Sequence, residues 1–259
     1  MKTLRILVCV VFVAVTVFYS YVRLTSRKDN TMPVITCSEQ KLLLSVKNTE
    51  ADILKYSSAY DQKDGDITSR ILIENISPYI TDGKADITFV VSDLDNNVSR
   101  LIVPAVYTDY YSPKFIIKKP LIVPLRARNF DFTDYIEVDD CIDGKTLSNS
   151  IITVSDFDIT IPGNYSLTLK TTNSRFDSSV LALNISVSSS SVVNPVNLKA
   201  YSIYCRIGDN IDFYSYIADG ETDISVDISK VDLLHAGVYE AVYSAEGRDA
   251  TPFIVICEE

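Results

Sequence analysis

Apolar and polar residues alternate over most of this chain, the pattern of strands with one packed and one solvated face. The alternation is clearest over 87–93, 165–170 and 239–244. Turn-forming residues recur about every 8–12 positions, as in an antiparallel sandwich. Helical periodicity is not evident outside one N-terminal run. The pattern therefore predicts an all-β chain after a single helix.

A short phrase recurs three times along the alternating region. Each copy has an apolar-x-x-Tyr turn, an Asp-Gly step, and a later Gly that opens an alternating run. The Asp-Gly steps fall at nearly even spacing, at Gly65, Gly144 and Gly220. A fixed period indicates one folding unit repeated in tandem. We expect these glycines to adopt positive φ in sharp turns between strands.

The phrase resembles the bacterial surface immunoglobulin-like domain, which occurs in tandem on secreted and wall-associated proteins and in some pesticidal crystal proteins. The first repeat matches best, with Asp-x-x-Asp-Gly-Asp-Ile-Thr over 61–68, although Ala85 replaces the usual Tyr. The second repeat keeps Asp-Gly and Pro-Gly-x-Tyr, and the third is the most divergent. The resemblance implies a fold and a surface setting, and it supplies no catalytic residues.

We therefore predict three tandem immunoglobulin-like β-sandwiches after one N-terminal transmembrane helix. The predicted parts are a signal anchor over 1–30, domain 1 over 33–107, domain 2 over 112–187, a Ser-rich linker over 188–195, and domain 3 over 196–259. The linker is polar, and we expect it to be mobile.

Residues 6–22 form the apolar N-terminal run, with basic residues on both sides. As a helix the run spans roughly 26 Å, against a bilayer core of roughly 30 Å. It ends in an aromatic cluster suited to a membrane interface, where a cleavage site would need small residues. We predict an uncleaved, single-pass signal anchor in the cell membrane, with cleavage as the alternative. Sandwich repeats that carry cysteines favour an extracellular location for residues after about 30.

The formal net charge of −10 argues against nucleic acid and anionic lipid as partners. Tyrosine is abundant, at 16 residues, and tryptophan is absent. Tyr107, Tyr110 and Tyr111 form a candidate interaction surface for a protein or glycan, although packing between domains is the alternative. The Asn-x-Ser sequons at Asn75, Asn97, Asn164 and Asn184 matter only in a host that glycosylates them.

Cys205 lies just before the first core strand of the third repeat, and Cys257 lies in its last strand. First and last strands of immunoglobulin-like sandwiches can run side by side, so we predict a Cys205–Cys257 disulfide, with free thiols as the alternative. There is no C-x-x-C pair, and turn chemistry explains the Asp-Gly loops without calcium. We predict no metal site and no cofactor.

No catalytic constellation is visible, and the single histidine, His235, lies in a turn. We expect a noncatalytic, membrane-anchored bacterial surface protein that mediates adhesion or protein interaction, or acts as a spacer. Its expected partners are the membrane, through the N-terminal helix, and an unidentified surface protein or glycan. The alternative is an extracytoplasmic glycan or ligand receptor. An envelope hydrolase is the least favoured reading.

Overall fold

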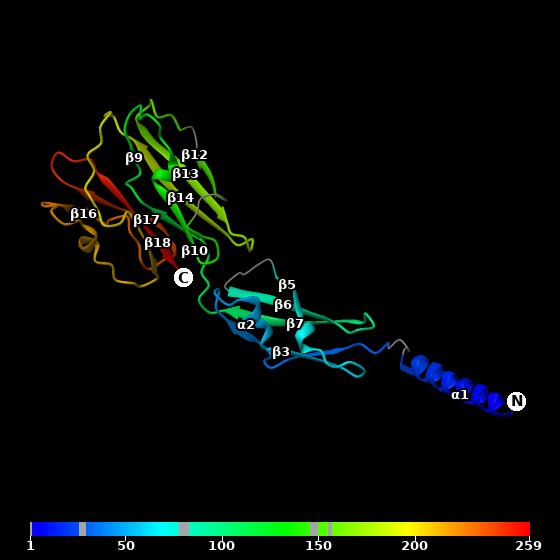
Figure 1. Ribbon diagram of the computed structural model, residues 1–259. Helices are drawn as coiled ribbons and strands as arrows, with labels where there is room; N and C mark the ends of the chain where they lie inside the picture. Colours follow the sequence, from blue (N-terminus) through cyan, green and yellow to red (C-terminus); the bar gives the residue numbers. More distant parts are fainter. Residues whose placement is uncertain (1, 26–29, 78–82, 146–149, 155–156) are drawn as a thin grey trace. The chain divides into compact units, whose positions relative to one another are not determined.

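The computed structural model describes residues 2–25, 30–77, 83–145, 150–154 and 157–259, apart from the side chains of 2–7, 24, 25 and 150–154. The chain forms two compact units (Figure 1). The first comprises Met1–Ser77 and Ala85–Val106 and holds the first repeat. The second holds the other two repeats, over Tyr107–Glu259. The described repeats consist of strands joined by short helical turns, so the all-β prediction is confirmed.

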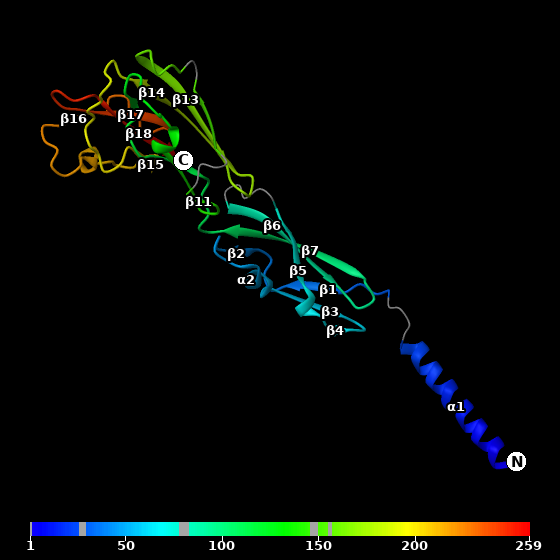
Figure 2. The same cartoon turned by 45° about the horizontal axis from the view of Figure 1, so that its top comes forward.

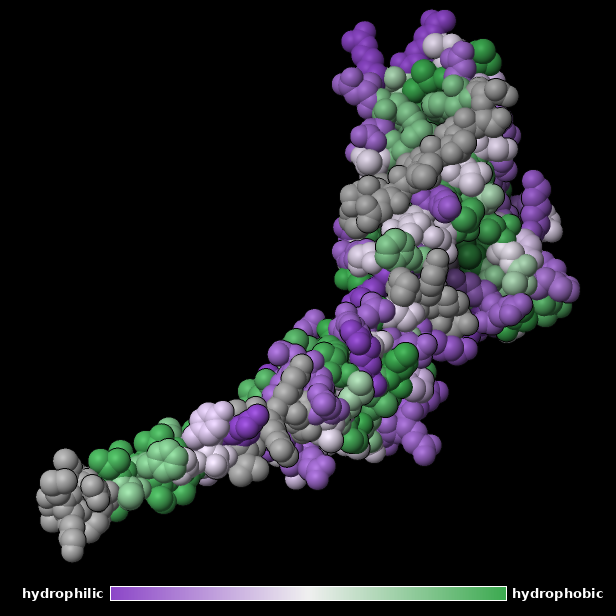
Figure 3. All heavy atoms as spheres, turned by 90° about the vertical axis from the view of Figure 1, so that its right-hand side faces the viewer, coloured by the Kyte–Doolittle hydropathy of each residue, from purple (hydrophilic) through white to green (hydrophobic). Residues whose placement is uncertain are grey.

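The N-terminal run forms helix α1 (Lys2–Thr25). Its described side chains, from Val8 to Arg23, are exposed, and Figure 3 shows mostly apolar residues on the visible face of this helix. Among the described residues, no helix combines the length and the apolar character that crossing a membrane requires. Residues 26–29, at the predicted junction with domain 1, lie outside the described residues.

The first repeat is a sandwich of two sheets, one in the order β1-β3-β4 and one in the order β2-β7-β6-β5. Its elements are β1 (Val34–Cys37), β2 (Leu42–Leu44), α2 (Glu50–Leu54), β3 (Ser57–Asp61), β4 (Gly65–Asp66), η1 (Thr68–Arg70), β5 (Leu72–Ile76), β6 (Lys84–Ser92) and β7 (Val98–Tyr107). Ile87, Phe89 and Val91 are almost fully buried, as the alternation predicts.

A helical turn occupies the apolar-x-x-Tyr position of every repeat: α2 in the first, η3 (Phe132–Asp134) in the second and η4 (Phe213–Tyr216) in the third. Each turn begins at a polar cap. Thr49 and Asp52 form a capping box on α2, while Asp131 and Asp212 accept backbone N–H groups at the starts of η3 and η4. These caps satisfy N–H groups that have no partner within a short helix.

The Asp-Gly loops also have a common local structure. Asp61 Oδ1 accepts the backbone N–H groups of residues 63 and 64 at 2.8 and 2.9 Å, and Asp140 Oδ1 accepts the equivalent pair, both at 2.7 Å. Gly65, Gly144 and Gly220 have φ of +77°, +74° and +89°. The predicted positive φ is confirmed in all three repeats, and it explains why glycine occurs there.

One buried contact differs between the first two repeats. In the second, Asn173 Nδ2 donates to Asp140 Oδ2 at 3.1 Å. Asp93 is the equivalent of Asn173 in the first repeat. Each side chain accepts the backbone N–H of the residue four positions further on, at 2.7 Å for Asp93 and 3.0 Å for Asn173. Asp93 has no amide to donate. Accordingly, Asp61 Oδ2 is buried without a hydrogen-bond partner in the described part of the chain.

Replacing Asp93 with Asn should therefore stabilise the first repeat. The new amide would donate to Asp61 Oδ2, and satisfying a buried acceptor contributes about 1–3 kcal/mol, reduced by the loss of the hydrogen bond that Asn97 Nδ2 donates to Asp93 Oδ2. Denaturant unfolding of the full chain would measure the gain, with Asp86→Asn, at an exposed position of β6, as the matched control. The reverse change, Asn173→Asp, should destabilise the second repeat. Equal stability of Asp93→Asn and the parent chain would contradict this account.

The second unit begins with another two-sheet sandwich. Its sheets have the orders β11-β10-β8 and β12-β13-β14-β9. The strands are β8 (Lys114–Ile117), β9 (Ile122–Val123), β10 (Ile136–Asp140), β11 (Gly144–Lys145), β12 (Ser150–Val154), β13 (Gly163–Thr172) and β14 (Ser178–Val187). The third repeat has a single four-stranded sheet, β15-β18-β17-β16, within the described residues. Its strands are β15 (Ser202–Arg206), β16 (Ser225–Asp227), β17 (Gly237–Ser244) and β18 (Thr251–Glu258).

Chain length explains why the third repeat lacks a second sheet. In the first two repeats the segments Tyr56–Gly65 and Tyr135–Gly144 each contain a five-residue strand, β3 or β10. The equivalent segment, Tyr216–Gly220, is too short for one. It contributes only an isolated bridge from Ile217 to Leu198. The hydroxyl of the buried Tyr243 donates to Phe213 O at 2.6 Å and fixes η4 over the open side of the sheet.

Strand β18 is buried on both faces. Phe253, Val255 and Cys257 belong to the core of the third repeat, whereas Ile254 and Ile256 belong to the core of the second. Figures 1 and 2 both place β17 and β18 beside the strands of the second repeat. The strand therefore contributes to the hydrophobic cores of both repeats, one on each of its faces.

Side chains of β15 complete the contact by capping the free edge of β8. Tyr204 accepts the N–H of Phe115 at its hydroxyl, at 2.9 Å, and Ser202 Oγ accepts the N–H of Ile117 at 3.0 Å. The ammonium of Lys114 lies over the Tyr204 ring, 4.4 Å from its centre. Unpaired edge N–H groups invite pairing with other chains, so these hydroxyls both protect β8 and position the third repeat.

The predicted linker, 188–195, is held by hydrogen bonds to both repeats. Ser188 N donates to Val123 O, and Leu125 N donates to Ser190 O, both at 2.8 Å. At the other end, Asn194 N donates to Asp249 Oδ2 at 2.6 Å. This segment thus forms part of the packed second unit.

Removing the Tyr204 hydroxyl should weaken the contact between the two repeats. Tyr204→Phe leaves the N–H of the buried Phe115 unpaired, at a cost of about 1–3 kcal/mol. Hydrogen exchange at the Phe115 amide should then accelerate. Tyr214→Phe, at an exposed tyrosine, is the control and should leave this exchange unchanged. Unaltered protection of Phe115 in Tyr204→Phe would show that the hydroxyl does not cap β8.

Candidate functional site

The outward face of β13 and β14 forms one wall of a cleft within the second unit. Alternation buries Leu167 and turns Asn164, on the same strand, outward. On β14, Asn184 and Ser186 point the same way, and Ser186 is the registered partner of Asn164. The start of β13 is fixed because the Tyr165 hydroxyl donates to Ile161 O at 2.8 Å. The Gly-x-Tyr motif of the repeat thus positions Asn164.

The facing wall comes from the third repeat. Glu240 and Val242 on β17 and Pro252 on β18 lie on the sheet face opposite the buried Ala241. Val242 and Pro252 are registered partners. Lys230 joins them from the segment after β16. The Gly-x-Tyr motif also positions Glu240. The hydroxyl of Tyr239, the residue before Glu240, donates to His235 O at 2.9 Å and fixes the start of β17.

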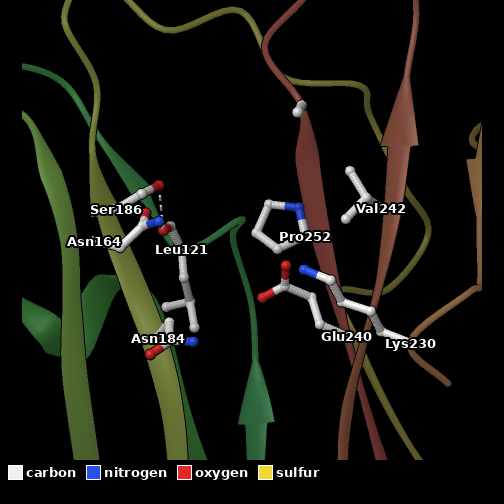
Figure 4. Close-up of a pocket in the computed structure, with 9 residues that line it drawn as sticks. Leu121, Asn164, Asn184, Ser186, Lys230, Glu240, Val242 and Pro252 are labelled. Carbon is white, nitrogen blue, oxygen red and sulfur yellow. Dashed lines mark hydrogen bonds between the residues drawn. The ribbon is translucent and has the colours of Figure 1, made fainter. Parts of the chain in front are cut away.

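Figure 4 shows the two walls facing each other across an open space. The cleft has a volume of about 290 Å³. Its lining combines polar and aliphatic side chains: Leu121, Asn164, Asn184, Ser186, Lys230, Glu240, Val242, Ala250 and Pro252.

Most polar groups of the cleft are available to a ligand. Ser186 Oγ donates to Leu121 O at 3.3 Å. Across the described residues, no hydrogen bond or ion pair engages the side chains of Asn164, Asn184, Lys230 or Glu240. The two carboxamides can each donate and accept, the carboxylate accepts, and the ammonium donates. This set suits recognition by several simultaneous hydrogen bonds.

The three tyrosines predicted as an interaction surface make contacts within the second unit. Tyr107 is 8% exposed, and the Tyr110 hydroxyl donates to Asp177 Oδ2. Tyr111 donates to Asp139 Oδ2 at 3.2 Å. Burial, reinforced by the bond to Asp177, raises the pKa of Tyr110 above its ordinary value. None of the three lines the cleft, and their role as an interaction surface stays a prediction.

The structure brings Cys205 and Cys257 together as registered partners on the parallel strands β15 and β18. Both are buried and are present as free thiols. Burial, helped by the hydrogen bond with Cys257, raises the pKa of the Cys205 thiol to about 11. The thiol is therefore protonated near neutral pH and reacts slowly once the protein has folded.

A metal site and a histidine-based catalytic site are the two other kinds of site that the residue types allow. In the described residues, no group of three or more His, Cys, Asp or Glu side chains could hold a metal ion. His235 Nδ1 lies 2.8 Å from Asp232 Oδ2 in an exposed turn. The backbone N–H of Leu234, followed by the His235 contact, lowers the pKa of Asp232. Neither residue lines the cleft.

Sequence reasoning missed the cleft. The sequence marks Asn164 and Asn184 only as sequons and Glu240 only as a position in the alternating run 239–244, and it gives no signal for Lys230. Each is an ordinary outward-facing polar residue in its own repeat. Only the packing of one repeat against the other brings the four together.

No protein-family model matches the chain, and no curated protein matches it. Among solved structures it is similar to that of CBM51-2 in complex with GlcNAc and INT domains from Clostridium perfringens ZmpB. The identity is 18% and the TM-score 0.25, over 59% of this chain and 41% of that one. It is also similar to protocadherin gammaB7 EC3-6, at 9% identity and a TM-score of 0.22, over 88% and 74% of the two chains. The chain thus spans about two fifths of the length of the C. perfringens structure. TM-scores this low establish neither the detailed fold nor the function of this chain.

The cysteine pair provides a direct test. In an oxidising compartment, Cys205 and Cys257 should form the predicted disulfide. After denaturation, an alkylating reagent should then modify neither cysteine in protein purified from that compartment. Reduction should then lower stability by up to about 4 kcal/mol, because the bond closes a loop of about 50 residues. Cys37→Ser is the control and should change neither result. Full alkylation of both cysteines would establish free thiols.

Proposed function

We propose that this protein is a noncatalytic binding protein of the bacterial cell surface, anchored by its N-terminal helix and mediating adhesion or interaction through its immunoglobulin-like repeats. The observation that carries the proposal is the cleft of the second unit, where four polar side chains make no hydrogen bond and no ion pair within the described part of the chain. Hydrogen-bonding groups held on two rigid sheets are suited to recognition. A spacer alone would have no use for them.

The chemistry of the cleft favours binding over catalysis. It contains one carboxylate and one ammonium but neither histidine nor cysteine. Hydrolysis by paired carboxylates would need a second acid close to Glu240, and none lines the cleft. An envelope hydrolase is therefore the least supported alternative.

The anchor and the extracellular location rest on the sequence. Residues 6–22 are apolar, and basic residues flank them. The same arrangement would serve a receptor for a soluble glycan or another small ligand. The cleft favours that second candidate over a pure spacer, because its volume suits a small molecule.

Cells that produce the full chain should display it to added protease, which should cut beyond about residue 30 without cell lysis. Purified full chain should bind isolated cell-wall material saturably and reversibly. It should release no soluble wall fragments on long incubation, since the proposed role involves no bond cleavage. Protection from protease on intact cells would contradict the surface location. Steady release of fragments would establish an enzyme instead.

A further inference from the structure

We infer that the cleft binds an uncharged saccharide of one or two rings, held by both repeats at once. This inference rests on the proposed surface-binding function and assigns that function a site and a ligand class. The supporting observations are the charge, the volume and the hydrogen-bonding groups of the cleft.

The charge balance points to a ligand without net charge. Lys230 and Glu240 are the two charged residues of the lining, and their formal charges cancel. The chain as a whole has a net charge of −10, which disfavours acidic polymers. The volume of about 290 Å³ lies near the lower end of the range for small-molecule pockets. A ligand of one or two sugar rings fits that size.

The polar groups match hydroxyls better than other ligand groups. A sugar hydroxyl donates and accepts at the same time, as the carboxamides of Asn164 and Asn184 do. The Glu240 carboxylate can accept from two adjacent hydroxyls. Leu121, Val242 and Pro252 offer aliphatic surface to the C–H groups of a ring. Every type of group in the cleft therefore has a counterpart on a saccharide.

A small zwitterion, such as a free amino acid, satisfies the site less well. Its two charges could engage Lys230 and Glu240, which both come from the third repeat. The carboxamides of Asn164 and Asn184 would then face the rest of the ligand without partners. Polar groups covered without a partner weaken binding. A polyhydroxylated ligand avoids this penalty by reaching both walls.

Contact with both walls has a further consequence. A ligand that touches Asn184 on the second repeat and Glu240 on the third binds only while the two repeats stay docked. Binding to the folded form alone raises the unfolding midpoint. The saccharide should therefore stabilise the whole second unit.

The test uses the full chain in detergent micelles, titrated by calorimetry with cellobiose, maltose and N,N′-diacetylchitobiose as uncharged probes. Alanine is the zwitterionic probe and glucuronic acid the anionic one. At least one uncharged disaccharide should bind saturably and raise the unfolding midpoint. Asn184→Ala and Glu240→Ala should each weaken disaccharide affinity by about tenfold or more, because each variant removes one hydrogen-bonding group from one wall of the cleft. Thr168→Ala, at an outward position of β13 away from the cleft, should change affinity less than about twofold.

Glu240→Gln separates the two ligand classes. Glutamine still accepts from a hydroxyl, so disaccharide affinity should fall only a few-fold, whereas a zwitterion would lose its charged partner and bind far more weakly. The unfolding midpoint of each variant without ligand shows whether the variant is folded. If Asn184→Ala is misfolded, Asn184→Asp is used in its place, and if Glu240→Ala is misfolded, Glu240→Gln is used.

Tight binding of the free amino acid alanine, without binding of any disaccharide, would overturn the assignment. Disaccharide binding that is unchanged in both Asn184→Ala and Glu240→Ala would overturn it as well. If no probe binds while the full chain still binds cell-wall material, the saccharide cleft fails and the proposed function stands. If the chain binds neither, both fail.

Discussion

Burial of β18 on both faces is the interaction on which the second unit depends. Its odd-numbered residues, such as Phe253 and Val255, fill the core of the third repeat, while Ile254 and Ile256 fill that of the second. A repeat of this size with only one complete sheet has too thin a core for much stability alone. Separated from its neighbour, it would also expose both isoleucines to water. The second and third repeats are therefore one thermodynamic body, although the sequence repeats mark them as two.

The edge of β8 determines how that body is assembled. Among the strands that the structure describes, none of the third repeat extends a sheet of the second by backbone pairing. Instead, the hydroxyls of Tyr204 and Ser202 accept the edge N–H groups of β8. Two point contacts fix the position of β15 without forcing its sheet to continue that of the second repeat. The cleft lies between the outward faces of the two sheets, lined by Asn164 and Asn184 on one side and Glu240 on the other.

The sequence was sufficient for the local structure of each repeat. Alternation identified the strands, and the Asp-Gly steps identified turns whose glycines have positive φ. Alternation does not predict that the second and third repeats pack against each other, but another feature of the sequence does. From Pro252 to Cys257 every residue is apolar, and a strand with one solvated face would alternate instead. The short Tyr216–Gly220 segment likewise signals a missing strand. The cleft is harder to predict, because nothing in one repeat shows which outward face another repeat will cover.

The position of the cleft follows from the composition of one sheet face. On the outward face of β17 and β18, Ile254 is the registered partner of Glu240, Ile256 that of Val238 and Pro252 that of Val242, so the buried isoleucines border the carboxylate directly. Burying the two isoleucines is favourable, whereas covering Glu240 and Lys230 without partners would cost several kcal/mol, on the order of the penalty for an uncompensated buried ion. Close packing therefore covers the isoleucines and ends at the half-buried Glu240 beside them. The facing strands of the second repeat carry asparagines at that point, so the space left open is polar on both sides. The contact that joins the repeats and the cavity that can hold a ligand are two consequences of the same face.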